Sequence, residues 1–225
     1  SPVWVSWVTG RVWRTLGPER VPSHQSSSES DKRADPYAGL AWLLLDKGLA
    51  GVMQLDFFDV VAGRRSVRAF KSTPVEREKI EDILNAANRA PSAGDLQAYQ
   101  IYLVTSRQRQ LALAQAALGQ MFIAEAPVVL VFCAVPARSA IKYGRRGQHL
   151  YSIQDASIAC AYAQLAASAL GLASTWVGAF DDVAVSRAIG APEGEIPVAI
   201  LPVGYPDEMP SPTPRRTLDN LVRKV

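Results

Sequence analysis

One ten-residue stretch constrains the fold more than any other part of the chain. Residues 126–135 read APVVLVFCAV and are apolar throughout. A strand with one solvated face alternates between apolar and polar residues, so an unbroken apolar run predicts a strand that is buried on both faces. We therefore expect this strand inside a sheet that helices flank on both sides.

The rest of the sequence alternates between predicted helices and strands. Helices are predicted over residues 54–64, 72–91, 106–119, 150–172 and 181–190. Strands are predicted over residues 98–106, 126–135, 173–180 and 196–206. Several connections between the predicted elements are short, so the sequence does not guarantee that all strands are parallel. The fold class is therefore α/β or α+β, with a central mixed sheet flanked by helices and an extended, proline-rich C-terminal arm.

Two of the predicted helices carry further signals. Thr73, Pro74 and Glu76 fit a capping box, which places the N-cap of the second helix at Thr73. The helix over residues 150–172 is apolar nearly all round and rich in small residues. A helix of that kind lies in a core or in an interface.

The chain divides near Met53. Residues 1–52 hold four of the five tryptophans and show no sustained period, whereas residues 53–225 read as a complete domain. One hypothesis is that residues 1–52 are an N-terminal extension that is poorly ordered or that comes from a misassigned start. The other is an arm whose tryptophans anchor on a partner surface.

Composition argues against several classes of protein. The net charge of +3 gives little support for nucleic-acid binding. Cys133 and Cys160 lie in apolar runs with no C-x-x-C spacing, so we expect no metal site and two buried thiols in a reducing cytosol.

The longest apolar run is too short for a bilayer, which takes about 20 residues. The first residues lack a signal-peptide core, so we expect a cytoplasmic protein without a membrane anchor.

The segment of most chemical interest is VVAGRRSVRAF, residues 60–70. It places Arg64, Arg65 and Arg68 around one hydroxyl, that of Ser66. Two guanidiniums, a hydroxyl and neighbouring backbone N–H groups are typical of a phosphate site. The alternative for an isolated segment of this kind is a solvated basic turn.

A second segment of interest joins a predicted helix to a predicted strand. It offers small and polar residues that let backbone approach a flat ligand: Pro91, Ser92, Ala93, Asp95 and Gln97. The alternative is an ordinary helix–strand loop, in which such residues are common turn formers.

Two later segments complete the set. The strand predicted over residues 173–180 ends at Gly178 and Ala179, which leaves their backbone N–H groups open. The proline-rich tail contains two further candidate basic residues, Arg215 and Arg216. The alternatives are core packing around Trp176 for the strand and a solvated tail for the two arginines.

In this order, the segments resemble the nitroreductase family of FMN-dependent oxidoreductases. They are RRSVRAF, APSAGDLQ, YSIQDASIA, GLASTWVGAF, and PVGYP followed by PRR. The resemblance runs from about Phe57 to Leu221. It implies an α/β/α-type fold, a homodimer, and FMN bound at the dimer interface.

The resemblance also implies roles for the residues of the arginine segment and the strand end. Arg64 and Ser66 match the positions that hold the FMN phosphate and ribityl chain. Arg68 matches the cation near the flavin N1/O2 edge, and Arg65 belongs to the same motif. Gly178 and Ala179 match the backbone that faces flavin N5.

The remaining matches lie in the loop and the tail. Ser92, Ala93 and Asp95, between Pro91 and Gln97, match a loop that reaches the FMN of the other subunit. Either Arg215 or Arg216 matches a late basic residue on the phosphate. Asp95 departs from the family, which usually has Asn there; an ionised Asp accepts hydrogen bonds and cannot donate them.

The function implied is hydride transfer from NAD(P)H through FMN to a nitroaromatic, a quinone or a similar small acceptor. The cofactor carries the redox chemistry, so no side-chain nucleophile and no metal is expected. Segment 139–151 is a candidate substrate lid, with Tyr143, Arg145 and His149 as candidate contacts, or else a solvated basic loop. The alternatives to an enzyme are a flavin-binding module or redox sensor with little turnover, and a basic nucleic-acid-binding domain.

Overall fold

The computed structural model describes residues 56–225. They lie within one of the two compact units into which the chain divides. The predicted extension, residues 1–52, lies outside the described residues, so the division near Met53 stays a prediction.

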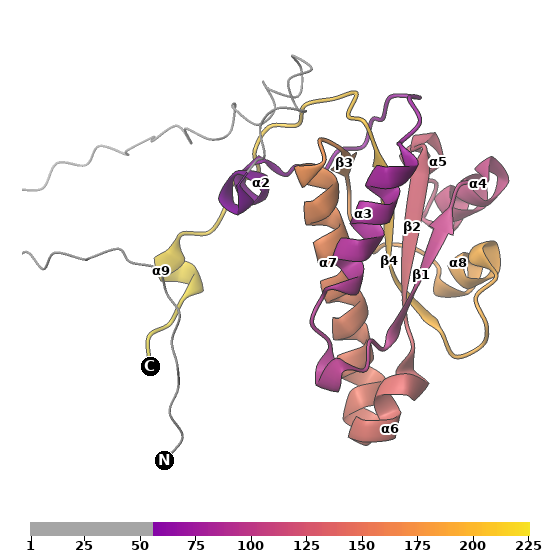
Figure 1. Ribbon diagram of the computed structural model, residues 1–225, viewed down its shortest axis with the longest axis vertical. Coiled ribbons are helices and arrows are strands. Elements are labelled where there is room, and N and C mark those ends of the chain that lie inside the picture. The colour runs from indigo at the N-terminus through magenta and orange to yellow at the C-terminus, as the bar shows by residue number, and fades with distance from the viewer. Residues whose placement is uncertain (1–55) are drawn as a thin grey trace, which may run out of the picture. The chain divides into compact units, whose positions relative to one another are not determined.

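A four-stranded sheet forms the centre of the described part (Figure 1). Its strands are β1 (Tyr99–Val104), β2 (Val128–Ala134), β3 (Ala173–Ser174) and β4 (Ile196–Gly204), in the order β1-β2-β4-β3. All three pairings between these strands are antiparallel. The parallel component of the predicted mixed sheet is one isolated bridge, between Ser66 and Ser174.

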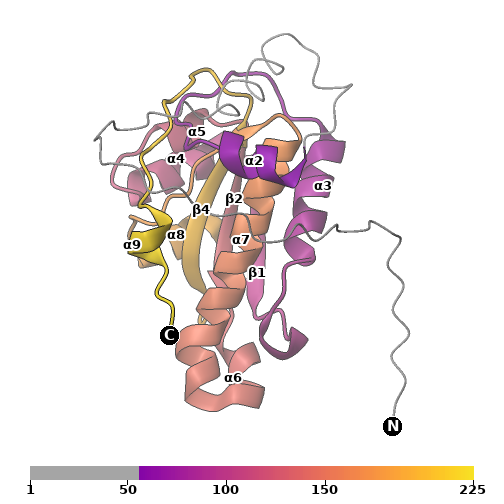
Figure 2. The ribbon, with the colours of Figure 1, turned by 90° about the vertical axis from the view of Figure 1, so that its left-hand side faces the viewer.

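Helices cover both faces of the sheet, as the apolar strand predicted. On one face lie α3 (Arg77–Asn88) and α7 (Ser152–Ala169); on the other lie α4 (Arg107–Ala116), α5 (Phe122–Glu125) and α8 (Asp182–Ile189) (Figures 1 and 2).

The central strand β2 is buried along its whole length. Its side chains alternate between two cores: Leu130 and Phe132 pack in the core that includes α3 and α7, whereas Val129 and Val131 pack in the core that includes α4 and α8. This arrangement confirms the α+β class with a sheet between two helical layers.

The strand predicted over residues 173–180 is shorter than expected. Regular pairing ends at Ser174, and one more bridge joins Val177 to Ile200 in the same register. That register places Thr175 opposite Pro202, which has no N–H to donate to the ladder. The sequence prediction missed this interruption because it depends on a residue of the facing strand, and the prediction considered each strand separately.

The capping box predicted at Thr73 is wrong. Helix α3 begins at Arg77, with Glu76 in extended conformation as its N-cap and no side-chain cap. The Glu76 carboxylate instead accepts a hydrogen bond of 2.8 Å from the Tyr205 hydroxyl and lies 3.6 Å from Lys79 Nζ. A tertiary contact therefore replaces the local one that the spacing favours.

Three helical pieces follow one another between β2 and β3, with a sharp break at Gly144, whose φ is 53°. Helix α6 (Pro136–Arg146) leads through a π-helical turn, η2 (Gly147–Tyr151), into α7. The segment of the candidate lid, residues 139–151, is helical on both sides of the break at Gly144, and its role as a lid stays a prediction. Gly147 is required where η2 folds back on α6, because a Cβ there would lie 2.4 Å from the Ser139 carbonyl oxygen.

Both ends of the described chain lie away from the sheet (Figure 1). Helix α2 (Phe57–Gly63) begins at Asp56, whose carboxylate accepts from the Asp59 N–H at 2.9 Å. After β4 the chain continues as the predicted extended arm, which contains only the short helix α9 (Leu218–Leu221). No helix among residues 56–225 is long and apolar enough to cross a membrane.

Candidate functional site

A cavity of about 610 Å³ lies between the end of α2, the segment that follows it and the C-terminal arm. Predicted site residues from both segments line it: Arg64, Arg65, Ser66, Arg68 and Arg215. The arm also contributes residues 210–213. Residues from opposite ends of the described chain therefore share one basic cavity.

The electrostatics of this cavity centre on Arg64, which is half-buried. Burial, followed by the charges of Arg215 and Arg65, lowers the pKa of the Arg64 guanidinium from its ordinary value. Within residues 56–225, no carboxylate forms a salt bridge with Arg64 or Arg215. A bound anion would relieve both the desolvation of Arg64 and the repulsion between the guanidiniums.

The backbone of the sheet positions the arginine segment. Ser66 bridges Ser174 of β3, and the Val67 N–H donates to the Ser174 carbonyl at 3.3 Å. The Val67 side chain is fully buried. Alternation in an extended segment then places Ser66 and Arg68 on the opposite side, where both line the cavity.

Arg65 has a different environment from Arg64. Its guanidinium donates to the carbonyl oxygens of Ala62 at 2.5 Å and of Arg64 at 3.0 Å. These carbonyls lie at the C-terminal end of α2, where a cation is favourable. The Arg65 side chain therefore caps the C-terminal end of α2, directly before Arg64.

Glu208 is a residue that the sequence reasoning missed. Its carboxylate accepts hydrogen bonds from the backbone N–H groups of Arg68 and, at 3.2 Å, of Ala69. The Asp207 N–H donates to the Ala69 carbonyl at 2.9 Å. These bonds hold the arm against the arginine segment. The paired residues are about 140 positions apart, so no local sequence pattern predicts the pairing.

The loop 91–97 contains backbone in left-handed conformation at three residues. Gly94, Asp95 and Gln97 have φ of 59°, 58° and 46°. Such values cost about 1–3 kcal/mol for a residue other than glycine and persist where surrounding contacts fix the backbone. The loop therefore needs specific anchors.

Asp155 of α7 is the main anchor, and it was not singled out from the sequence. Its carboxylate accepts from the Ala93 N–H at 2.9 Å and from the Ala98 N–H at 3.3 Å, and the residue is 2% exposed. The Ser92 hydroxyl accepts from the Gln97 N–H at 2.9 Å. Asp95 itself is exposed, so its carboxylate is open to a ligand.

Gly178 and Ala179 are exposed and do not line the basic cavity. The Ala179 carbonyl accepts from the Gln120 side chain at 3.3 Å. No hydrogen bond from either residue's N–H is made to the described part of the chain. These two N–H groups follow the strand that pairs with Ser66 and remain available.

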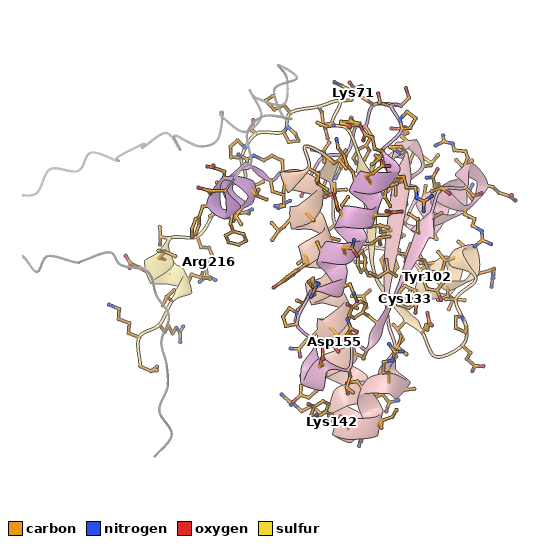
Figure 3. The ribbon with its side chains drawn as sticks, in the orientation of Figure 1. Lys71, Tyr102, Cys133, Lys142, Asp155 and Arg216 are labelled. Carbon is orange, nitrogen blue, oxygen red and sulfur yellow. The ribbon has the colours of Figure 1, made fainter. Side chains whose placement is uncertain are left out.

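Within one chain, the predicted site residues lie in two separate places. The basic cavity involves α2, which lies near the C-terminal end of α7, whereas loop 91–97 lies beside α6 at the other end (Figures 1 and 2). Arg215 lines the cavity, while Arg216 turns to the Asn220 carbonyl of α9 (Figure 3).

Comparisons with known proteins identify the family of the chain. A family model described as "Nitroreductase family" matches residues 61–205. The "NADH dehydrogenase" of Thermus thermophilus is 30% identical over 195 residues, which cover 75% of this chain and 95% of that protein.

Solved structures give the same result. One is the "NADPH:FMN oxidoreductase from Vibrio harveyi complexed with NAD+", at TM-score 0.69 and 27% identity, covering 75% of this chain and 76% of that one. Another is an "FMN-dependent nitroreductase" from Clostridium difficile, at TM-score 0.59 and 30% identity, covering 67% and 88% of the two chains.

A sheet between helical layers, with a cavity lined by arginines beside its edge strand, defines an α+β protein with a candidate anion site. The chain belongs to the nitroreductase family.

Proposed function

We propose that this protein is an FMN-dependent oxidoreductase that passes hydride from NAD(P)H through bound FMN to a nitroaromatic, a quinone or a similar small acceptor. Its relatives include an NADPH:FMN oxidoreductase and an FMN-dependent nitroreductase, which supports the flavin and the nicotinamide. FMN supplies the hydride-accepting chemistry.

The observation that carries the proposal is the unneutralised charge around Arg64. A half-buried guanidinium with a lowered pKa, close to two other guanidiniums, fits a phosphate dianion. Arg64, Ser66 and Arg215 would hold the phosphate. Arg68 lines the same cavity and would place its charge at the N1/O2 edge of the ring, where negative charge accumulates on reduction.

The exposed apolar residues support a homodimer. Phe57 and Phe58 of α2 are 63% and 77% exposed, and Leu218 and Leu221 of α9 are 73% and 60% exposed. Apolar side chains gathered on two short helices are typical of a surface that another chain covers. In the dimer, loop 91–97 of one subunit would contact the FMN held by the arginines of the other.

Cys133 and Cys160 support a cytoplasmic location. Both are buried free thiols, and a reducing compartment keeps cysteines in that state.

The test is anaerobic stopped-flow absorbance on protein purified with its FMN. We expect flavin bleaching by NADH or NADPH, followed by reoxidation when a nitroaromatic or a quinone is added. Bound FMN that neither nicotinamide bleaches would identify a flavin-binding module or redox sensor instead. Protein that binds no FMN would contradict the proposal.

A further inference from the structure

Two cations and two tyrosines form a compact cluster on α6 and η2. The rings of Tyr143 and Tyr151 meet edge to face, with centroids 5.1 Å apart. Lys142 Nζ lies 5.4 Å from the Tyr143 ring centroid, and the Arg146 guanidinium lies 5.4 Å from that of Tyr151. Arg146 Nε also donates to the Tyr151 hydroxyl at 2.9 Å. We call these residues the α6 cluster.

The α6 cluster lies directly against loop 91–97. A Cβ added to Gly94 would lie 2.5 Å from the Tyr143 hydroxyl oxygen and 2.8 Å from Lys142 Nζ. Arg138, also on α6, donates to the Gln97 carbonyl at 3.0 Å. Lys142 lies below Asp155, the anchor of the loop (Figure 3). Whatever ligand this loop contacts therefore lies close to the cluster.

The charge of this region is unbalanced. Residues 126–154 include four cations, Arg138, Lys142, Arg145 and Arg146, and no aspartate or glutamate. Two carboxylates border the region: Asp155, which accepts from two backbone N–H groups, and the exposed Asp95 of loop 91–97. In the described part of the chain, no carboxylate pairs with Lys142 or Arg146. Both side chains are exposed, and both tyrosine rings are half-buried. Cations without a carboxylate partner, beside aromatic rings, fit a ligand that carries both a phosphate and an aromatic base.

We infer that the α6 cluster binds the adenosine half of the nicotinamide cofactor and selects NADPH through its 2′-phosphate. This inference rests on the proposed function, in which loop 91–97 contacts the flavin and so places the cluster where a bound nicotinamide cofactor would extend. NADPH differs from NADH only in that phosphate, which Lys142 and Arg146 are charged to receive. The tyrosine rings offer faces on which adenine would stack.

Isothermal titration of the FMN-loaded protein tests the site without hydride transfer. The probes are 2′-phospho-ADP-ribose and ADP-ribose, which lack the nicotinamide ring. We expect the 2′-phosphorylated probe to bind about tenfold more tightly or better, since one charged contact to a phosphate is worth at least that. Arg146→Gln and Lys142→Gln should each remove most of this ratio. Arg107→Gln, an equal loss of charge at the exposed start of α4, should leave it unchanged.

Equal affinity for the two probes in the wild type would overturn the inference. An equal loss for both probes in Arg146→Gln would also overturn it, because the cations would then serve the shared diphosphate. The specificity constant kcat/KM provides the second readout, with a fall of about tenfold expected for NADPH and less than twofold for NADH. Failure of the proposed function would look different: neither nicotinamide would bleach the flavin, whatever the two probes do.

Discussion

Arg64 and Arg215, from opposite ends of the described chain, line one cavity, and the charge of Arg215 adds to burial in lowering the pKa of the Arg64 guanidinium. The structure brings this repulsive pair together through the pairing of the arm with the arginine segment at Ala69 and Glu208. An anion bound between two like charges held together in this way would stabilise both of them. The proposed FMN phosphate site follows from that relationship.

Arg68→Gln should lower the midpoint potential of bound FMN. The substitution removes the charge that we place at the N1/O2 edge, and each shift of about 30 mV in this two-electron couple corresponds to roughly 1.4 kcal/mol. Phosphate binding by Arg64 and Ser66 should persist. Anaerobic redox titration of the wild type and the variant measures the shift. An unchanged potential with FMN fully bound would assign that edge to another group.

Asp155→Asn should destabilise the protein by about 1–3 kcal/mol, because one amide oxygen cannot satisfy two backbone donors, one of them buried. The N–H of Ala93 or of Ala98 would then face the Asn amino group. Urea denaturation of the variant and of an Asp182→Asn control, at an exposed position of α8, gives the comparison. Equal stability of the wild type and Asp155→Asn would show that the loop does not depend on this carboxylate.

The structure shows which parts of the fold were predictable. The apolar run in β2 correctly predicted a strand between two helical layers. A strand buried on both faces carries apolar residues at every position, so its own sequence is enough to recognise it. The capping box at Thr73 failed because the Tyr205 hydroxyl engages Glu76. The strand after Ala173 was overextended because Pro202 interrupts the ladder from the facing strand. Both errors came from partners distant in sequence.

The candidate site shows the same division. Arg64, Ser66 and Arg68 are close together in sequence, and motif spacing was enough to group them. Glu208 and Asp155 fix the segments around the site through hydrogen bonds that no local pattern encodes. Sequence alone also left Arg215 and Arg216 as equal alternatives, whereas the path of the arm places only Arg215 in the cavity.

Phe58→Asp should weaken the proposed homodimer and release FMN with it. The Phe58 side chain is 77% exposed in the single chain, so the substitution should not disturb the monomer core. Val183→Asp is the control, since Val183 is 68% exposed on α8, which packs on the face of the sheet opposite α7. Sedimentation velocity with detection at the flavin absorbance measures both effects. A stable wild-type monomer that retains FMN would contradict the dimer.

The most direct test of the phosphate site compares the binding of FMN with that of riboflavin, which lacks only the phosphate. Fluorescence titration of the apoprotein should show that FMN binds about 100-fold more tightly or better, since charged hydrogen bonds contribute about 1.5–3 kcal/mol each. Arg64→Ala should reduce this ratio by about tenfold or more, and Arg107→Ala should not change it. Equal affinity for FMN and riboflavin in the wild type, or an unchanged ratio in Arg64→Ala, would contradict the assignment of this cavity to the FMN phosphate.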